Sequence, residues 1–281
     1  MTMKKTSWII MLIFCGSLSQ RSAFAQIAGF EKAEWTTREV AKGIVWRHTH
    51  TTALLGGVAQ NINVLEIDTR KRDVTLVYDK DRNRPTSELS KEAKALASVN
   101  AGFFDMKNGG STAYIKVDGS VPDKDTLKWR NYPRYSGTVI ITTRGRIEIE
   151  KKGDHHSYTG NRKYDDVLVT GNLLMDDGQK INLKDDAFVT TRHPRTCLGI
   201  VSKNKILLVT VDGRFDQAAG MDLHELTDLM VSLGCREAIN LDGGGSTTMW
   251  LADEGVVNMP SDNKKFDHEG ERDVSNIIAV R

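Results

Sequence analysis

The clearest pattern of hydrophobic and polar positions lies in the last third of the chain, where two strand-like segments flank a helical one. Lys205–Val211 and Ala238–Leu241 are short runs of aliphatic residues, which predict two strands. Asp222–Leu233 carries an apolar residue every three or four positions, which predicts a helix with one buried face. Gly234 follows, at a position where helix ends favour glycine. A strand, a helix and a second strand predict a βαβ crossover with the two strands parallel.

Short β-type runs separated by polar turns fill much of the remaining chain. These runs are Asn61–Asp68, Val74–Val77, Ala97–Val99, Thr138–Thr142, Ile147–Ile149, Val167–Thr170, Ala187–Thr190 and Cys197–Val201. The polar segment Thr69–Asp73 predicts that the first two form a hairpin. Ser87–Ala97 has helical spacing and begins after Pro85, which predicts a helix. The whole pattern predicts a mixed α/β fold, α+β-like in character, with a central, mainly antiparallel sheet and a βαβ crossover in the C-terminal half.

The first 25 residues have the three parts of a secretory signal peptide. Two lysines precede the apolar run Trp8–Leu18, and Ala23-Phe24-Ala25 fits the small-x-small cleavage pattern. The apolar run is shorter than the roughly 20 residues that a membrane span needs. We therefore expect cleavage after Ala25 and a periplasmic or secreted protein with no membrane insertion. Residues 26–59 are expected to form an N-terminal lead-in, and residues 60–281 a single domain.

Composition and charge exclude some classes of protein. The chain has 281 residues, of which 39% are hydrophobic and 27% charged, as in ordinary globular proteins. Its 39 basic residues oppose 37 acidic ones, and removal of Lys4, Lys5 and Arg21 with the signal peptide leaves 36 against 37. A net charge of −1 lacks the positive excess of a nucleic-acid-binding protein. We therefore expect no nucleic-acid partner.

The cysteines and histidines give little support for a metal site. Cys197 and Cys235 remain after cleavage, and their apolar surroundings favour buried free thiols, although pairing stays open. The sequence contains no CxxC or HxxxH spacing, and the adjacent His155 and His156 would point apart on a regular element. We therefore expect no transition-metal centre.

Candidate chemistry begins where the two C-terminal strands end, because each is followed by a carboxylate, Asp212 and Asp242. In open α/β sheets, ligands bind at the carboxyl ends of the strands. Two acids at that edge form a plausible acid/base pair. Each also begins an Asp-Gly dipeptide, which is common in turns without any catalytic role.

An unusual glycine-rich turn follows Asp242. It consists of Gly243, Gly244, Gly245, Ser246 and Thr247. Three consecutive glycines are costly in conformational entropy, and they are tolerated where the backbone approaches a ligand or directs N–H groups at an anion. The turn is not a Walker loop, because no Lys-Ser/Thr follows at the required place. Together with Asp242, it predicts a site for an anion and a sugar.

Two other charged residues have both a functional and a structural interpretation. Arg195 follows Pro194 at the start of a predicted strand, where it could present a bidentate fork to phosphate or lie in a solvated turn. Glu225 lies three residues after Asp222, which fits a helix capping box and competes with an acid/base role.

A series of motifs in one order resembles the phosphodiester glycosidase family. The motifs are Asn100–Phe104, Pro194–Gly199, Val211–Arg214, Gly220–Glu225, Asn240–Met249, Asn258–Asp262 and Glu271–Asn276. The resemblance extends from about residue 60 to residue 281. It implies an exported hydrolase that cleaves a sugar-1-phosphodiester, such as an N-acetylglucosamine-1-phosphodiester, at the anomeric C–O bond.

The resemblance also implies roles for individual residues. Asp242 would act as nucleophile or base, with Asp212 and Glu225 as candidates for a second acid/base role. Arg195 and the backbone of the glycine turn would hold the phosphate. The remaining candidates for substrate binding are Asn100, Asn240, Gly243, Gly244, Gly245, Ser246, Thr247 and Arg272. Arg272 could instead pair with an acid to hold the C-terminal segment.

The expected partner is a carbohydrate substrate that contains phosphate, and the oligomeric state is open. No cofactor is expected. Two alternatives remain: a non-catalytic protein that binds glycan or exopolysaccharide on the same fold, and a metal-dependent phosphodiesterase in which Asp212 and Asp242 hold Mg²⁺ or Ca²⁺.

Overall fold

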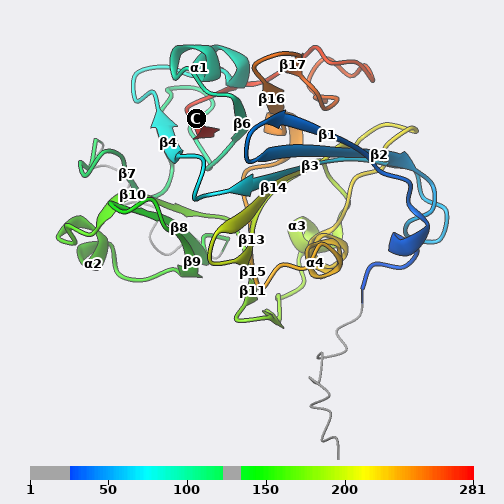
Figure 1. Cartoon of the computed structure of the whole chain (residues 1–281), viewed down its shortest axis with the longest axis horizontal. Coiled ribbons are helices and arrows are strands. Elements are labelled where there is room, and N and C mark those ends of the chain that lie inside the picture. Colours follow the sequence, from blue (N-terminus) through cyan, green and yellow to red (C-terminus); the bar gives the residue numbers. More distant parts are fainter. Residues whose placement is uncertain (1–25, 123–133) are drawn as a thin grey trace, which may run out of the picture.

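The computed structural model describes residues 26–122 and 134–281. In this part of the chain, antiparallel sheets predominate and helices are few (Figure 1). The predicted signal peptide, residues 1–25, lies outside the described residues. None of the described helices is both long and apolar enough to cross a membrane.

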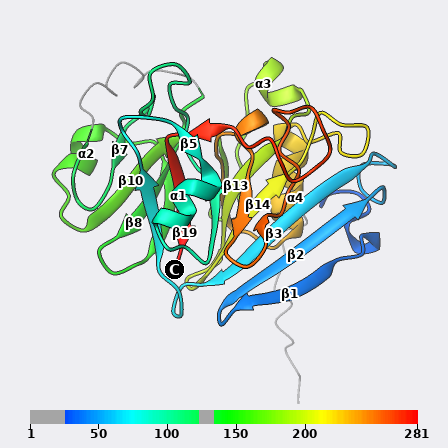
Figure 2. The same cartoon turned by 90° about the horizontal axis from the view of Figure 1, so that it is seen from above.

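The largest sheet has eight strands, and each neighbouring pair in it is antiparallel. In spatial order these are β1 (Thr36–Ala41), β2 (Ile44–Thr51), β3 (Gln60–Asp68), β14 (Lys205–Val211), β13 (Arg195–Ser202), β15 (Glu237–Asn240), β11 (Leu173–Asp176) and β12 (Gln179–Lys180). Figure 2 shows β1, β2 and β3 side by side at one edge. Residues 26–59, expected as a lead-in, therefore supply two strands of the main sheet.

Three smaller sheets complete the strand arrangement. One contains β17 (Gly255–Val256), β16 (Met249–Leu251), β6 (Ala97–Asn100), β19 (Asn276–Val280) and β4 (Val74–Tyr78). The next contains β7 (Ile115–Lys116), β10 (Tyr164–Thr170), β8 (Gly137–Thr142) and β9 (Ile147–Lys151). The smallest pairs β18 (Asp273–Val274) with β5 (Arg84–Pro85).

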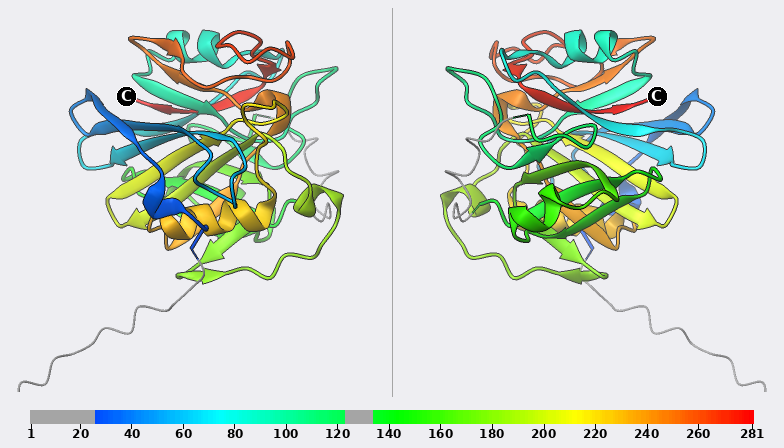
Figure 3. Two further views of the ribbon diagram at one scale, coloured as in Figure 1. Left: turned by 90° about the vertical axis from the view of Figure 1, so that its right-hand side faces the viewer. Right: turned by 90° about the vertical axis from the view of Figure 1, so that its left-hand side faces the viewer.

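Four α-helices and two 3₁₀ turns are described outside the strands. They are α1 (Thr86–Glu92), α2 (His155–Thr159), α3 (Ala187–Thr190), α4 (Leu223–Ser232), η1 (Phe30–Lys32) and η3 (Gly244–Ser246). Figure 3 shows α1 against the five-stranded sheet and α4 against the eight-stranded sheet. The two longer helices thus cover separate layers of the molecule.

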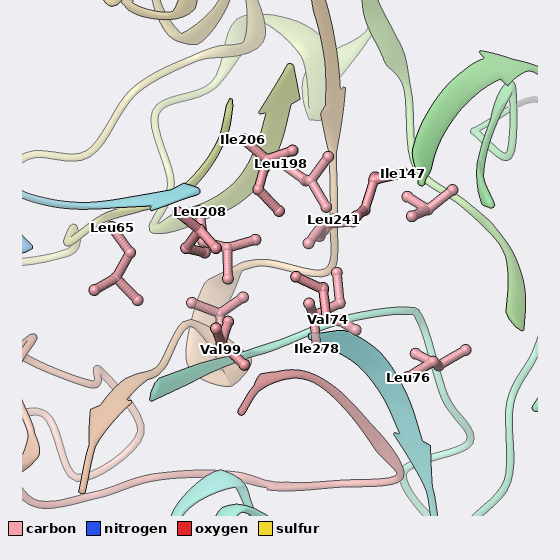
Figure 4. Packing of buried hydrophobic residues seen from close by; sticks show 14 of the residues in the cluster. Leu65, Val74, Leu76, Val99, Ile147, Leu198, Ile206, Leu208, Leu241 and Ile278 are labelled. Carbon is pink, nitrogen blue, oxygen red and sulfur yellow. The ribbon is translucent and has the colours of Figure 1, made fainter. Parts of the chain in front are cut away.

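Alternation along β14 explains how the main sheet buries both of its faces. Leu208 belongs to a core shared by the sheets, together with Val99 and Ile278 of the five-stranded sheet (Figure 4). Leu207 and Val209 face the other way and pack with the apolar side of α4. Successive side chains of a strand point to opposite faces, so the uninterrupted apolar run 206–209 fits a strand buried on both sides.

Two predictions of strand pairing differ from the structure. β3 and β4 do not form a hairpin, because β2 and β14 occupy the two edges of β3 while β4 pairs with β19 in another sheet. β14, α4 and β15 follow one another as expected, but β13 lies between the two strands and pairs with both. β14 and β15 therefore run in the same direction, since both are antiparallel to β13, but they are not neighbours in the sheet.

Helix predictions succeeded where the capping residues were clear. α4 has the predicted capping box, and Gly234 after it has a left-handed φ of 84°. The predicted helix Ser87–Ala97 is shorter, because Lys94 turns left-handed at φ 53° and the chain then joins the sheet. Ala187–Thr190, predicted as β, forms α3, because the Asp186 side chain caps it by accepting from the Val189 amide at 2.9 Å.

Candidate active site

Three of the predicted site residues lie at one edge of the eight-stranded sheet. β13 runs opposite to β14 and β15, so its first residue, Arg195, lies at the end where those strands finish. Asp212 and Asp242 follow these two strands. Two carboxylates and a guanidinium group that are far apart in the sequence therefore lie at the same edge of the eight-stranded sheet.

Asp242 is held by its backbone at the start of the glycine turn. Its amide donates to the Ala101 carbonyl at 2.8 Å, and its own carbonyl accepts from the Asn100 side-chain amide at 2.7 Å. Burial raises the pKa of its carboxyl to about 6, while Ser246 and the positive charge of Arg272 act in the opposite direction. The carboxylate form, which a nucleophile or base requires, thus predominates above this pH.

The glycines after Asp242 allow close packing against two other segments. The Gly244 amide donates to the Pro194 carbonyl at 2.8 Å, and a Cβ on Gly243 would lie 2.6 Å from that same oxygen. A Cβ on Gly245 would overlap the side chains of Asp262 and Arg272. These contacts explain the triplet through close packing, and the Gly244 N–H is not directed at an anion.

Arg195 is buried and engaged with backbone carbonyls. Its Nε donates to the Met221 carbonyl at 2.9 Å, and its Nη2 donates to the carbonyls of Phe188 and Thr191, each at 2.9 Å. Burial lowers its pKa to about 10. Because both nitrogens already donate within the protein, Arg195 joins α3 to the segment before α4, and a bidentate fork toward phosphate would compete with these bonds.

Arg272 forms a bidentate ion pair with Asp262, with Nε–Oδ2 and Nη2–Oδ1 distances of 2.7 Å. The pair contacts the glycine turn, since it occupies the space that a Cβ on Gly245 would need. Of the two roles considered for Arg272, pairing with an acid is the one formed here. The pair holds the C-terminal segment against the turn.

Asp212 lies at the centre of a buried hydrogen-bond network. One carboxylate oxygen accepts from the Asn258 amide at 2.8 Å; the other accepts from the Asn61 amide at 2.6 Å and the Met259 N–H at 3.0 Å. Asn258 also donates to the Thr247 carbonyl at 3.0 Å. Burial raises the pKa of Asp212 to about 6, against the effect of these donors. The network anchors the end of the glycine turn.

Glu225 is engaged in the capping box of α4. Its carboxylate accepts from the Asp222 amide at 3.1 Å, and its own amide donates to Asp222 Oδ1 at 2.8 Å. It also forms a bidentate ion pair with Arg192. These contacts place Glu225 in the structural role that competed with an acid/base role.

Some of the amide and hydroxyl candidates hold neighbouring segments in place through hydrogen bonds, whereas others have polar atoms without a partner in the described structure. Asn100 accepts from the Thr196 hydroxyl at 2.7 Å and from the Thr248 amide at 3.1 Å, so its oxygen is fully engaged. Asn240 donates to the Leu241 carbonyl at 2.8 Å. In the described structure, the buried Asn240 Oδ1 and Thr247 Oγ1 have no hydrogen-bond partner. Unpaired buried polar atoms are unfavourable, which suits them to bind a ligand's hydroxyl or amide groups.

Two further residues lie beside the turn. Arg214 is exposed, has a left-handed φ of 70°, and its Nη2 would lie 3.0 Å from a Cβ on Gly244. His193 has a buried Nδ1 without a partner in the described structure, and burial, with the charges of Arg195 and Arg214, lowers its pKa. Arg214 belongs to the Val211–Arg214 motif, which was the available signal. Its contact with Gly244 depends on the fold.

Comparison with known sequences gives a family match. Residues 93–281 match the phosphodiester glycosidase family. The bovine N-acetylglucosamine-1-phosphodiester alpha-N-acetylglucosaminidase is 37% identical over 192 residues, covering 65% of this chain and 36% of that protein. The human protein of the same name is 33% identical over 227 residues, covering 71% and 40%. The chain therefore spans less than half the length of these relatives.

Solved structures agree at the level of the fold. The catalytic domain of the zebrafish N-acetylglucosamine-1-phosphodiester alpha-N-acetylglucosaminidase, auto-inhibited by its pro-peptide, matches with a TM-score of 0.67 at 18% identity, covering 92% of this chain and 87% of that one. A hypothetical protein from Synechocystis matches with a TM-score of 0.62 at 15% identity, covering 88% and 63%. At these identities the likeness extends to the fold alone.

Proposed function

The chain belongs to the phosphodiester glycosidase family, and from that premise we propose that it is an exported hydrolase that cleaves a sugar-1-phosphodiester, of the N-acetylglucosamine-1-phosphodiester type, at the anomeric C–O bond. The observation that carries the proposal is the environment of Asp242. Its carboxyl is buried and has a pKa raised to about 6, and Asp242 begins a turn that is flanked by the guanidinium groups of Arg214 and Arg272. In a sugar-1-phosphodiester, a carboxylate can act at the anomeric carbon while a neighbouring cation binds the phosphate attached to that carbon.

The reaction needs a carboxylate near the anomeric carbon and positive charge near the phosphate. A phosphate monoester has a second pKa of about 6, so it departs with little need for protonation. Asp242 either attacks the anomeric carbon, in which case water then hydrolyses the glycosyl ester formed on Asp242, or removes a proton from the attacking water. The anomeric C–O bond breaks, and the phosphate monoester leaves with the bonding electrons.

We assign phosphate binding first to Arg214, because it is exposed and its contact with Gly244 places it at the turn. Arg195, buried at the same edge of the sheet, contributes positive charge and positions the surrounding chain. The unpaired Asn240 Oδ1 and Thr247 Oγ1 are candidates to bind sugar hydroxyl or acetamido groups. The Ser246 hydroxyl lowers the pKa of Asp242 but has no hydrogen-bond partner in the described structure, so it would be available to orient that carboxylate.

Asp212 and Glu225 support the site in this proposal without taking part in proton transfer. Both already accept several hydrogen bonds within the protein. His193 is the alternative group for a second proton transfer, because its lowered pKa keeps the imidazole neutral near pH 7.

The deciding experiment measures N-acetylglucosamine released from a synthetic α-N-acetylglucosamine-1-phosphate methyl diester. Wild type, Asp242→Asn and Arg195→Ala are compared, each with and without EDTA. We expect turnover by wild type and a loss of at least about a hundredfold in Asp242→Asn, since a positioned base or nucleophile contributes on that scale. Substrate binding without release of free sugar by wild type would refute the hydrolase proposal and leave a glycan-binding protein.

The metal-dependent alternative is disfavoured by the contacts of Asp212. Both oxygens of this carboxylate already accept hydrogen bonds within the protein, so bidentate coordination of Mg²⁺ or Ca²⁺ would require it to exchange these donors. We therefore expect EDTA to leave turnover unchanged. Complete loss with EDTA and recovery with added Mg²⁺ or Ca²⁺ would support the metal-dependent reaction instead.

Export is a further part of the proposal. It rests on the signal-peptide features of residues 1–25. N-terminal sequencing of the mature protein from a bacterial expression host tests it directly, with Gln26 expected as the first residue. A mature protein that begins at Met1 would contradict the predicted cleavage.

A further inference from the structure

A groove lined by cationic side chains lies away from the candidate active site. Four turns or loops contribute to its wall, and the cavity has a volume of about 720 Å³. Its charged side chains are Arg70, Arg144, Arg146, Lys163, Lys203 and the single carboxylate Glu148. We call this set the basic groove.

The basic groove and the candidate active site lie at opposite ends of β14. Asn204, before the first residue of β14, lines the groove, whereas Asp212 follows the last residue. Seven strand residues at about 3.3 Å each separate the two ends by roughly 20 Å. The groove is therefore distinct from the site around Asp242.

Part of the positive charge in the basic groove is not neutralised by neighbouring acids. Arg70 pairs with Asp68 at 2.8 Å, and Arg146 lies 3.3 Å from Glu148. Arg144, Lys163 and Lys203 are exposed and make no ion pair within residues 26–122 and 134–281. Three uncompensated cations in one groove contrast with a chain whose 39 basic residues are nearly balanced by 37 acidic ones.

The turns that carry these cations are fixed by hydrogen bonds. The Thr69 amide donates to the Asn204 carbonyl at 3.0 Å, which joins the turn after β3 to the turn before β14. The Thr143 amide donates to the Lys163 carbonyl at 2.9 Å, which joins the turn after β8 to the loop before β10. The positive charges therefore belong to a fixed frame, and a concave surface concentrates their potential.

The neutral lining distinguishes between classes of polyanion. Three threonines and Asn204 offer hydroxyl and amide groups between the cations. None of the side chains that line the groove is aromatic, so it has no platform on which nucleotide bases could stack. Cations interspersed with small hydrogen-bonding groups suit the phosphates and hydroxyls of a glycan.

We propose that the basic groove is a second, non-catalytic binding site for the phosphate groups of an anionic glycan chain. This inference goes beyond the proposed hydrolase activity and does not depend on it, because binding at the groove is measured without turnover. A phosphate-bearing polymer held here would be retained by the protein independently of the site around Asp242.

The test compares binding of a poly(glycerol phosphate) teichoic-acid chain, neutral dextran of similar length, and a single-stranded oligothymidylate, at low and raised salt. The test variant is Arg144→Ala/Lys163→Ala/Lys203→Ala. The matched control is Lys32→Ala/Lys91→Ala/Lys184→Ala, which removes the same charge at exposed positions elsewhere. Thermal unfolding of all three proteins checks that the surface changes leave the fold intact.

We expect wild type to bind the teichoic-acid chain in a salt-sensitive manner and not to bind dextran. The groove variant should raise the dissociation constant by about tenfold or more, because it removes three phosphate contacts, while the control variant stays within about twofold of wild type. Equal binding by wild type and the groove variant would overturn the proposal, as would equal binding of dextran. Tighter binding of oligothymidylate than of teichoic acid would overturn the assignment to a glycan.

Discussion

The side-chain amide of Asn100 donates a 2.7 Å hydrogen bond to the backbone carbonyl of Asp242, which is 142 positions away in the sequence. Asn100 ends β6 in the five-stranded sheet, and Asp242 follows β15 in the eight-stranded sheet. The same asparagine accepts from the Thr196 hydroxyl and the Thr248 amide. One buried side chain therefore joins two sheets to the start and the end of the glycine turn, and it acts as a positioning residue.

Replacing this asparagine tests the positioning role. In Asn100→Ala, we expect a loss of stability of about 1–3 kcal/mol from the unsatisfied buried groups. The kcat for a sugar phosphodiester should fall while KM changes less, because the Asp242 carboxylate is displaced but the phosphate contacts remain. Denaturant unfolding and steady-state kinetics measure both effects. A stable variant that only raises KM would indicate that Asn100 binds substrate directly.

The pH dependence of activity should reflect the raised pKa of Asp242. If the carboxylate form is active, kcat/KM should rise about tenfold per pH unit at acidic pH and level off above about pH 6. A pH–rate profile on wild type measures this limb. Asp212→Asn provides the control, since the limb should persist in any activity that this variant retains. A limb that disappears in Asp212→Asn would assign the titration to Asp212.

The free energy of unfolding should depend on pH in the sense opposite to kcat/KM. The folded state holds the proton of Asp212 up to about pH 6, whereas an unfolded chain releases it near pH 4. The unfolding free energy contributed by this group therefore falls as pH rises between about 4 and 6, and it is constant outside that window. Asp212→Asn should flatten this slope in denaturant unfolding measured across the window, and an unchanged slope would exclude Asp212 as its source.

The glycine turn should not tolerate a side chain at Gly245. In Gly245→Ala, the added Cβ overlaps Asp262 and Arg272, so the bidentate pair must separate or the turn must shift. We expect a loss of stability of about 1–3 kcal/mol, typical of overpacking, together with a large loss of activity. Gly160→Ala is the control, because its Cβ would lie 3.8 Å from the nearest neighbouring atom. Similar unfolding curves for the two variants would contradict the packing explanation.

Arg214 should contribute to phosphate binding and little to the fold, since its hydrogen bond to the Ser261 hydroxyl is long, at 3.4 Å. Arg214→Ala removes an exposed cation beside Gly244 and should raise KM for a phosphodiester by about tenfold, equivalent to 1.4 kcal/mol. The melting temperature should stay close to that of wild type. Arg82→Ala, which removes another exposed arginine, should leave KM unchanged. Equal KM values for Arg214→Ala and wild type would remove Arg214 from the site.

Several features could be predicted from local sequence because their causes are local. Asp222 and Glu225 are three residues apart, so their reciprocal capping bonds form within the first turn of α4. The alternation along β14 determines which side chains face each core. The Asp242 turn was identifiable because three consecutive glycines require a special backbone environment. The sequence did not indicate that this environment was packing against Pro194 and Asp262.

The family, the strands and helix around the candidate site, and the residues that could carry its chemistry could all be predicted from the sequence alone. The tertiary structure decided that β13 separates β14 from β15, that Arg195 donates to backbone carbonyls, and that Arg214 contacts Gly244. The physical reason is the range of the interactions. Hydrophobic periodicity and capping act over a few residues, whereas strand partners and buried hydrogen bonds are selected among groups that only folding brings together.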